Sequence, residues 1–344
     1  MSQGPVRRAT MADVAARAGV SIKTVSRVVN NVPSVDPELA RRVRAAAAEL
    51  HFSRNFAASA LRSKVSAWTI GLVIKDLENE FYATIASAVA AVAKTNGAQL
   101  IMSHSSERFE DELEVVTELC HRRVNGLLIV PTGGDHSSLA SEMERGIPMV
   151  FIDRIPVNLE ADYVVLDNFA GAYAATAKLL AEGHTRIGAL IDTLNMATMG
   201  RRLNGVRQAF HDRAIPFDES LVAYDVSTPD KAAVRVRELL ARPDAPTAFI
   251  CGNNRSGVGA LSALWELGSE AALASFDDFY LSQLMPRPFT VVKYDNRALG
   301  TVAAEILFRR IRGEEFPLQS VVLPTHLEAR GVRTQPSNTG KERS

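Results

Sequence analysis

The chain has 344 residues, of which 47% are hydrophobic and 23% charged. This composition is typical of soluble globular domains, excludes a collagen-like or mostly disordered chain, and at this length favours two or three domains. The sequence has neither an apolar run of the roughly 20 residues that span a membrane nor a secretory signal, so we expect no membrane partner. Its two cysteines, Cys120 and Cys251, are far apart, which argues against a disulfide framework or a zinc site and favours a cytoplasmic location.

The net charge of zero conceals an uneven distribution. Residues 1–65 hold eleven Lys or Arg and four acidic residues, a net charge of +7, so the remainder carries −7. A basic head on an acidic body indicates a polyanion-binding module joined to a second function.

The head reads as three short helices. Thr10 can cap a first helix, with Asp13 completing a capping box, and Gly19 supplies the left-handed residue that ends it. Ser21 can then cap a second helix, and this order predicts a helix-turn-helix. Asp36 and Pro37 begin a third helix, since proline fits the first helical position.

A longer string makes the prediction specific. Residues 11–30 (MADVAARAGVSIKTVSRVVN), followed by VDP at 35–37 and RNFAASALR at 54–62, resemble the DNA-binding head of LacI/GalR-family transcriptional regulators. The resemblance extends to about Val332. It implies four parts: a helix-turn-helix head at 1–51, a hinge helix and linker at 52–66, an effector-binding and dimerisation body at 67–332, and a polar tail at 333–344.

The resemblance also implies how the head meets DNA. Ile22, Lys23 and Arg27 would enter the major groove, where the two cations can donate to guanine and Ile22 can contact a thymine methyl. Other polar residues would contact phosphates or cap helices, and for the first two of them capping alone is an equal alternative: Thr10, Ser21, Thr24, Ser26 and Asn30. In the hinge, Asn55, Ala58 and Leu61 are implied DNA contacts, with Leu61 as a minor-groove wedge.

The body alternates β-rich runs with helical stretches, a pattern typical of parallel sheets flanked by helices. One series of runs is expected at 68–74, 99–104, 126–130 and 148–153. A second series is expected at 163–167, 186–191, 221–226, 247–251 and 273–277, with helices at 169–182, 200–213, 229–241 and 255–267. We therefore predict two doubly wound α/β lobes, which the resemblance identifies as periplasmic-binding-protein-like.

Ligands of such sheets bind beyond the carboxyl ends of the strands. Asp167 is predicted to end the first strand of the second series. The candidate effector-binding residues, from strand ends and from the resemblance, are Asp76, Phe81, Asp153, Thr198, Arg202, Asn253 and Asp277. Phe81 is a possible stacking face for a ligand. For Asp153 and Arg154 the alternative to ligand contact is that they pair with each other, and for Arg201 the alternative is a solvated helix residue. Carboxylates that accept from hydroxyls suit a sugar, sugar acid or similar polyol.

The predicted function is a cytoplasmic, homodimeric repressor, released from a pseudo-palindromic operator by a small effector. A corepressor-dependent regulator or an activator of the same family is the alternative, and a solute-binding protein is a remote one. We expect no catalytic residues, because the sequence has no nucleophile motif, and no metal or cofactor.

Overall fold

The structure is a computed structural model that describes residues 9–29, 35–50, 52 and 68–331. The chain divides into two compact units, Met1–Ala67 and Trp68–Ser344. They are called the head and the body below, and each is considered separately.

The head is a three-helix unit: α1 (Met11–Ala18), α2 (Ile22–Val29) and α3 (Pro37–Glu49). The predicted caps are confirmed: Thr10 and Asp13 form a capping box, and Asp36 accepts from the backbone of α3. Gly19 has a φ of 63°, in the left-handed region that glycine adopts without strain. The core is small and aliphatic, built from Val14, Val25, Val28 and Val43 with alanines around them.

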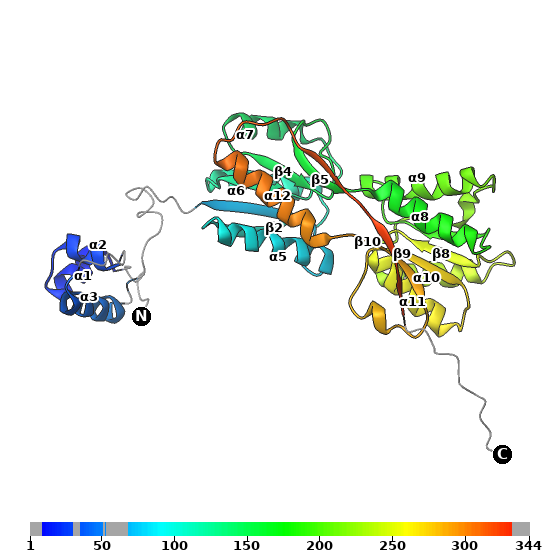
Figure 1. Ribbon diagram of the computed structural model, residues 1–344, viewed down its shortest axis with the longest axis horizontal. Helices are drawn as coiled ribbons and strands as arrows, with labels where there is room; N and C mark the ends of the chain where they lie inside the picture. The colour runs from blue at the N-terminus through cyan, green and yellow to red at the C-terminus, as the bar shows by residue number, and fades with distance from the viewer. Residues whose placement is uncertain (1–8, 30–34, 51, 53–67, 332–344) are drawn as a thin grey trace, which may run out of the picture. The chain divides into compact units, whose positions relative to one another are not determined.

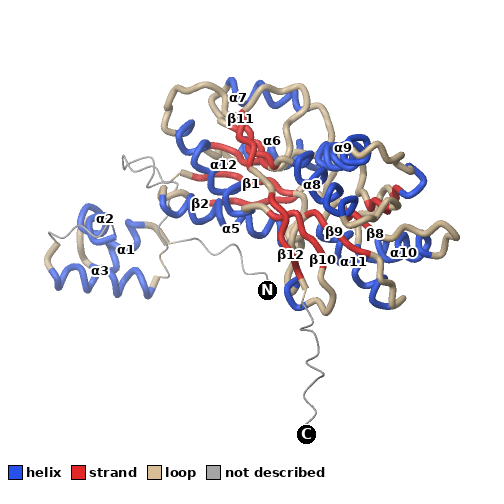
Figure 2. The backbone as a smooth tube through the Cα atoms, turned by 45° about the vertical axis from the view of Figure 1, so that its right-hand side comes forward, coloured by secondary structure: helices blue, strands red, loops and turns tan. Residues whose placement is uncertain are grey.

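The body contains, among its described residues, two six-stranded sheets, one in each of two lobes (Figures 1 and 2). The N-terminal lobe has the strand order β11-β5-β4-β3-β1-β2, and every pairing is parallel. Its strands are β1 (Thr69–Ile74), β2 (Gln99–His104), β3 (Gly126–Ile129), β4 (Met149–Ile152), β5 (Asp162–Leu166) and β11 (Ser320–Leu323).

Helices cover both faces of this first sheet. Ile70, Leu72 and Ile74 share one core with α5 (Glu80–Thr95) and α12 (Asn296–Ile311). Alternate residues such as Val73 face the other core, with α6 (Phe109–His121) and α7 (Ala140–Glu144). This two-sided burial explains why the strands read as continuous apolar runs.

The C-terminal lobe has the order β12-β10-β9-β8-β6-β7, with β12 antiparallel to β10. Its strands are β6 (Ile187–Leu190), β7 (Val222–Ala223), β8 (Ala248–Cys251), β9 (Ala272–Phe276), β10 (Phe289–Lys293) and β12 (His326–Arg330). The flanking helices are α8 (Asn168–Ala181) and α9 (Ala197–Asp212) on one face, and α10 (Pro229–Leu240) and α11 (Asn254–Glu266) on the other. Short 3₁₀ turns lie at His136–Leu139, Glu219–Leu221 and Ser282–Leu284.

Three predictions for the strands need correction. The run at 163–167 does not open the second series, because β5 pairs with β4 and β11 in the N-terminal lobe. Asp167 therefore lies at a crossing between lobes. The run at 221–226 yields only the two-residue edge strand β7, and β10, β11 and β12 lie outside the predicted runs. Both β11 and β12 are edge strands with partly exposed residues, so their apolar signal is weak.

The chain passes between the lobes after β5, after β10 and between β11 and β12, as Figure 1 shows. These segments tie the lobes together while each lobe keeps its own sheet. Within the described part of the chain, no helix combines the length and the apolar character needed to cross a bilayer.

Candidate functional site

The outer face of α2 carries the residues predicted to read bases. Ile22 is 53% exposed, and Lys23 and Arg27 are exposed too, whereas Val25 and Val28 are buried in the head. Helical spacing separates the two faces. A large apolar side chain next to two cations at a helix start suits base edges and phosphates.

Two of the predicted phosphate contacts also cap helices. The Thr10 hydroxyl accepts from the Asp13 amide at 3.3 Å, and the Ser21 hydroxyl accepts from the Thr24 amide at 3.1 Å. The capping roles of Thr10 and Ser21 are thus confirmed, and DNA contacts by them, by Thr24 and by Ser26 stay predictions.

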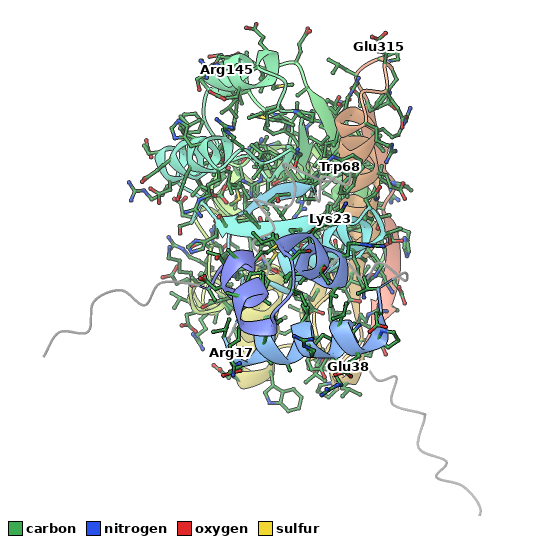
Figure 3. All side chains as sticks on the ribbon, turned by 90° about the vertical axis from the view of Figure 1, so that its left-hand side faces the viewer. Arg17, Lys23, Glu38, Trp68, Arg145 and Glu315 are labelled. Carbon is green, nitrogen blue, oxygen red and sulfur yellow. The ribbon has the colours of Figure 1, made fainter. Side chains whose placement is uncertain are left out.

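Several head cations are used within the head. Arg17 pairs with Glu49 at 2.7 Å, and Arg42 donates to the Ala18 carbonyl at 2.6 Å. Figure 3 labels Arg17 and Lys23, which lie on different helices. The head's positive charge therefore serves partly to join its helices. The other predicted contacts, Asn30, Asn55, Ala58 and Leu61, lie outside the described residues.

In the body, a polar cleft lies where the carboxyl ends of strands from both lobes meet. Asp76 follows β1 and Asp153 follows β4, while Asn253 follows β8 and Asp277 follows β9. All seven predicted effector-binding residues line this cleft: Asp76, Phe81, Asp153, Thr198, Arg202, Asn253 and Asp277. The structure thus brings together residues spread over 200 positions of sequence, and their contact with a ligand stays a prediction.

Arg202, on α9, lines the cleft and is buried. Its Nε donates to the Asn168 Oδ1 at 2.8 Å, and another guanidinium nitrogen donates to the Gly252 carbonyl. The guanidinium lies 3.6 Å from the Phe276 ring centroid and 3.8 Å from Asp277 Oδ1. These contacts fix Arg202 in place, so a ligand would meet a preorganised cation.

Asp153 and Asp277 occupy matching places in the two lobes. Each directly follows a strand and has a φ of 69°, a left-handed conformation that is uncommon for residues other than glycine. Tyr294 donates to Asp277, whereas the Asp153 Oδ1 is buried without a hydrogen-bond partner. Burial raises the pKa of the Asp153 carboxyl, and the adjacent Arg154 opposes this shift. Such strain and perturbed titration are frequent at functional sites.

Next to Asp153, a second buried cation is held by carboxylates. The Arg154 Nη1 lies 2.5 Å from Glu107 Oε1 and its Nε lies 3.5 Å from Asp153. The predicted alternative of an Asp153–Arg154 pair is thus present. Burial lowers the pKa of Arg154, but nearby Tyr82, Glu107 and Asp153 outweigh it and raise that pKa overall. Arg201 is exposed on α9, in agreement with the alternative that it is a solvated helix residue.

Phe81 forms a wall of the cleft. It is only 7% exposed, and its ring lies edge-on to Tyr82 at 4.9 Å and Tyr294 at 6.3 Å between centroids. Because its ring packs against these neighbours, it offers little open face for stacking.

The lobes contact each other directly across the cleft. Asn254 Nδ2 donates to Asn79 Oδ1 at 2.9 Å, Arg255 pairs with Asp76 at 3.3 Å, and Lys75 lies 4.0 Å from Asp192. The cavity between them has a volume of about 50 Å³, far below the ~300–1,000 Å³ of typical ligand pockets. Ligand entry therefore requires the lobes to part and these contacts to break.

Sequence reasoning missed three charged residues that line the cleft, Lys75, Asp192 and Arg255, and one that contacts its lining, Glu107. Lys75 and Asp192 lie at the ends of β-rich runs, so the strand-end rule could have found them. Glu107 and Arg255 follow from tertiary contacts, and no local signal marks them. Among the described residues, no cluster of His, Cys, Asp and Glu is arranged to hold a metal ion.

Comparison with known families identifies both units. Residues 10–55 match the family "bacterial regulatory proteins, lacI family". Residues 67–327 match the family "periplasmic binding proteins and sugar binding domain of LacI family". The chain belongs to the LacI family of transcriptional regulators. The match at the head argues against the solute-binding alternative, and the two matches together place DNA binding and effector binding on one chain.

Individual relatives support the same family assignment. This LacI-family chain is 31% identical to the HTH-type transcriptional regulator GalR of Escherichia coli K12, over 95% of this chain and 96% of that protein. A Lac repressor dimer bound to operator and the anti-inducer ONPF superposes with a TM-score of 0.78 at 26% identity, covering 93% of this chain and 98% of that one. A complex of the transcriptional regulator CelR with cellobiose gives 0.68 at 29% identity, with the same coverage of both chains. The chain is thus a ligand-responsive, DNA-binding transcriptional regulator.

Proposed function

We propose that this regulator is a cytoplasmic repressor that leaves its operator when a small polyhydroxylated effector, a sugar or a sugar acid, occupies the cleft between the lobes. The observation that carries the effector assignment is the unpartnered Asp153 Oδ1, buried among fixed cations in that cleft. A buried carboxylate oxygen without a partner costs free energy unless a ligand hydroxyl donates to it. The similar regulator CelR forms a complex with cellobiose, which supports a sugar-like ligand.

The control of DNA binding follows from linkage. The cleft in this closed arrangement is too small for a sugar, so a bound effector favours a different spacing of the lobes. If operator-bound heads require one spacing, the effector weakens operator binding and the operator weakens effector binding by the same factor. In the corepressor alternative the ligand occupies the same cleft, but it strengthens operator binding instead of weakening it.

An apolar groove on the C-terminal lobe supports a homodimer. The groove, called the α11 groove, has a volume of about 700 Å³ and includes Val258, Leu261 and Trp265 of α11 with Tyr280 and Phe289. Trp265 is 65% and Tyr280 78% exposed. Large apolar patches rimmed by polar residues mark interaction sites. A second copy is the occupant we propose, since operator half-sites require paired heads and the similar Lac repressor is a dimer.

The effector assignment is tested with DNA and isosteric variants. Operator binding is measured by fluorescence anisotropy on a fragment from upstream of the protein's own coding sequence, with a panel of sugars and sugar acids. We expect one compound to release wild-type protein, and Asp153→Asn to bind operator normally but to respond at least tenfold more weakly. Asp135→Asn, at an exposed carboxylate of the same lobe, is the matched control.

A second set of variants locates the ligand. Arg202→Lys and Asp277→Asn should also weaken the effector, measured by calorimetry, with thermal melts to verify folding. Undiminished effector binding by all three cleft variants would place the ligand elsewhere. For an inducer, we expect the effector to bind operator-free protein more tightly than the operator complex. Tighter operator binding in the presence of the ligand would instead identify a corepressor.

A further inference from the structure

The charges that line the cleft are already balanced by the chain. Its four cations each face a carboxylate within 4.0 Å: Lys75 with Glu107 and Asp192, Arg154 with Glu107, Arg202 with Asp277, and Arg255 with Asp76. The carboxylates of the cleft and its rim number one more than these cations, because Asp153 is also present. Among the described residues, this cleft therefore offers no cation in excess for an anionic ligand.

Glu107 is the carboxylate that contacts both cations of the N-terminal lobe, Lys75 and Arg154. Its two carboxylate oxygens accept from Arg154 at 2.5 and 3.3 Å, and one of them lies 3.5 Å from the Lys75 Nζ. Glu107 and its neighbour Ser106 have φ values of 60° and 52°, a strained pair for side chains other than glycine. This strained turn holds the carboxylate where the acid group of a ligand could otherwise meet two cations.

The atoms left for a ligand suit hydroxyl groups. The Asp153 Oδ1 is an acceptor and the Arg154 Nε–H a donor, and both are buried without a hydrogen-bond partner. A hydroxyl can donate to the first and accept from the second. A planar base is less suited, because Phe81 packs against Tyr82 and Tyr294 and is only 7% exposed.

We propose that the cleft selects an uncharged polyhydroxylated ligand, which narrows the effector from a sugar or sugar acid to an uncharged sugar, and that Glu107 is the specificity-determining residue that excludes carboxylate- and phosphate-bearing analogues. The proposal rests on the proposed function, which places the effector in this cleft. An anionic ligand would either face an excess of carboxylates or displace the half-buried Glu107 from the buried Arg154, which breaks their ion pair and is costly. Exclusion by an existing like charge is a direct way to discriminate between analogues.

The test compares neutral sugars with their charged partners. Glucose, galactose and ribose are tested against glucuronate, galacturonate, glucose 6-phosphate and ribose 5-phosphate on the full chain, by thermal shift and then calorimetry. Wild type should be stabilised by at least one neutral sugar and by none of the acids or phosphates. In Glu107→Gln, the charged partner of that sugar should gain at least tenfold in affinity.

Two variants control for folding and for general charge effects. Glu110→Gln removes an exposed carboxylate from α6 and should keep the wild-type preference. Glu107→Asp keeps the charge and should also keep that preference, so a change seen only with glutamine reports the charge. If Glu107→Gln does not fold, Glu107→Asp provides the test. The proposal is supported if Glu107→Asp binds the charged ligand as poorly as wild type does. It is overturned if Glu107→Asp binds the charged ligand as tightly as the neutral one.

The outcomes separate the two claims. The charge proposal is overturned if an acid or phosphate binds wild type more tightly than its neutral partner, if no neutral sugar stabilises wild type, or if Glu107→Gln leaves the preference unchanged. By contrast, sugar binding that survives both Asp153→Asn and Arg202→Lys contradicts the location of the site and hence the proposed function.

Discussion

Asp153, in the cleft, combines several features that lower the stability of the folded protein. Asp153 adopts a left-handed backbone conformation, is buried, and leaves one carboxylate oxygen without a partner. Each of these features costs free energy in the folded state. Residues that combine such costs are expected at sites that bind ligands, and the same reasoning predicts how replacements behave.

Asp153→Asn should make the protein more stable at pH 7. Because burial raises the pKa of the Asp153 carboxyl, the folded state holds this proton more tightly than the unfolded state. Wild-type stability therefore falls as the pH rises from about 4, the ordinary range of an aspartate, through the raised pKa. The variant lacks this loss, so we expect a gain of about 0.5–2 kcal/mol at pH 7.

Denaturant unfolding of wild type and variant across pH 4–8 measures this difference. Glu114→Gln, at an exposed carboxylate of α6, serves as the control. A variant that is equally stable at pH 7, or one whose advantage grows as the pH falls, would contradict the assignment of a destabilising charge to Asp153.

In the head, Lys23 and Arg27 provide the residue-scale test of DNA reading. Replacing either by alanine should cost about 1–3 kcal/mol of operator binding if it makes a bidentate base contact. Loss of a phosphate contact would instead lower the salt dependence and weaken binding to all DNA sequences alike. Arg17→Ala, at a residue paired with Glu49, is the comparison. Wild-type affinity of both variants at matched salt would exclude this face of α2 from the interface.

At the scale of elements, close helix contacts set the geometry of the lobes. In α9, a Cβ at Gly205 would lie against the Phe169 carbonyl and within 2.9 Å of the Tyr173 amide, so α8 and α9 pack backbone to backbone. One turn and a half earlier in the same helix, a Cβ at Gly200 would meet nothing within 4 Å. The two glycines thus differ in packing while sharing one helix.

Alanine at these two positions should therefore act in opposite directions. Gly205→Ala forces α8 away from α9 and should destabilise the body by about 1–3 kcal/mol. Gly200→Ala should stabilise it by about 0.5–1 kcal/mol, because alanine is the better helix former and has room. Thermal unfolding of both variants decides the matter. Equal effects of the two substitutions would mean that the α8–α9 contact is looser than described.

At the scale of the whole molecule, the proposed coupling needs two lobes that move and two copies that stay together. The lobes are joined by three crossing segments in the described chain, and ion pairs such as Arg255–Asp76 hold the cleft closed. The α11 groove is the surface we assign to the second copy. It is separate from the cleft, because no residue lines both.

Val258→Glu should dissociate the proposed dimer. Val258 is 40% exposed on α11 and lines the groove, so a glutamate there would be desolvated without a partner upon dimerisation. Sedimentation velocity should report a monomer, with operator affinity reduced at least tenfold. Val234→Glu, at a 48% exposed valine of α10 outside the groove, should remain a dimer. A dimeric Val258→Glu protein would remove the groove from the interface.

Local patterns determined much of this protein from its sequence. Caps at Thr10 and Asp36, the left-handed Gly19 and the alternation of apolar runs with helices depend on neighbouring residues, so they predicted the head and the two α/β lobes. Polar residues at strand ends predicted the lining of the cleft, because parallel strands of one sheet present their carboxyl ends at the same edge.

Contacts between distant segments were decided only by the tertiary structure. The run that became β5 is equally apolar in either lobe, and its pairing with β4 and the remote β11 fixed its sheet. Likewise, Glu107 and Arg154 are 47 positions apart, and nothing local to either predicts their ion pair. The charge balance of the cleft depends on such pairs, because the free energy of a buried charge depends on which partner the fold places beside it.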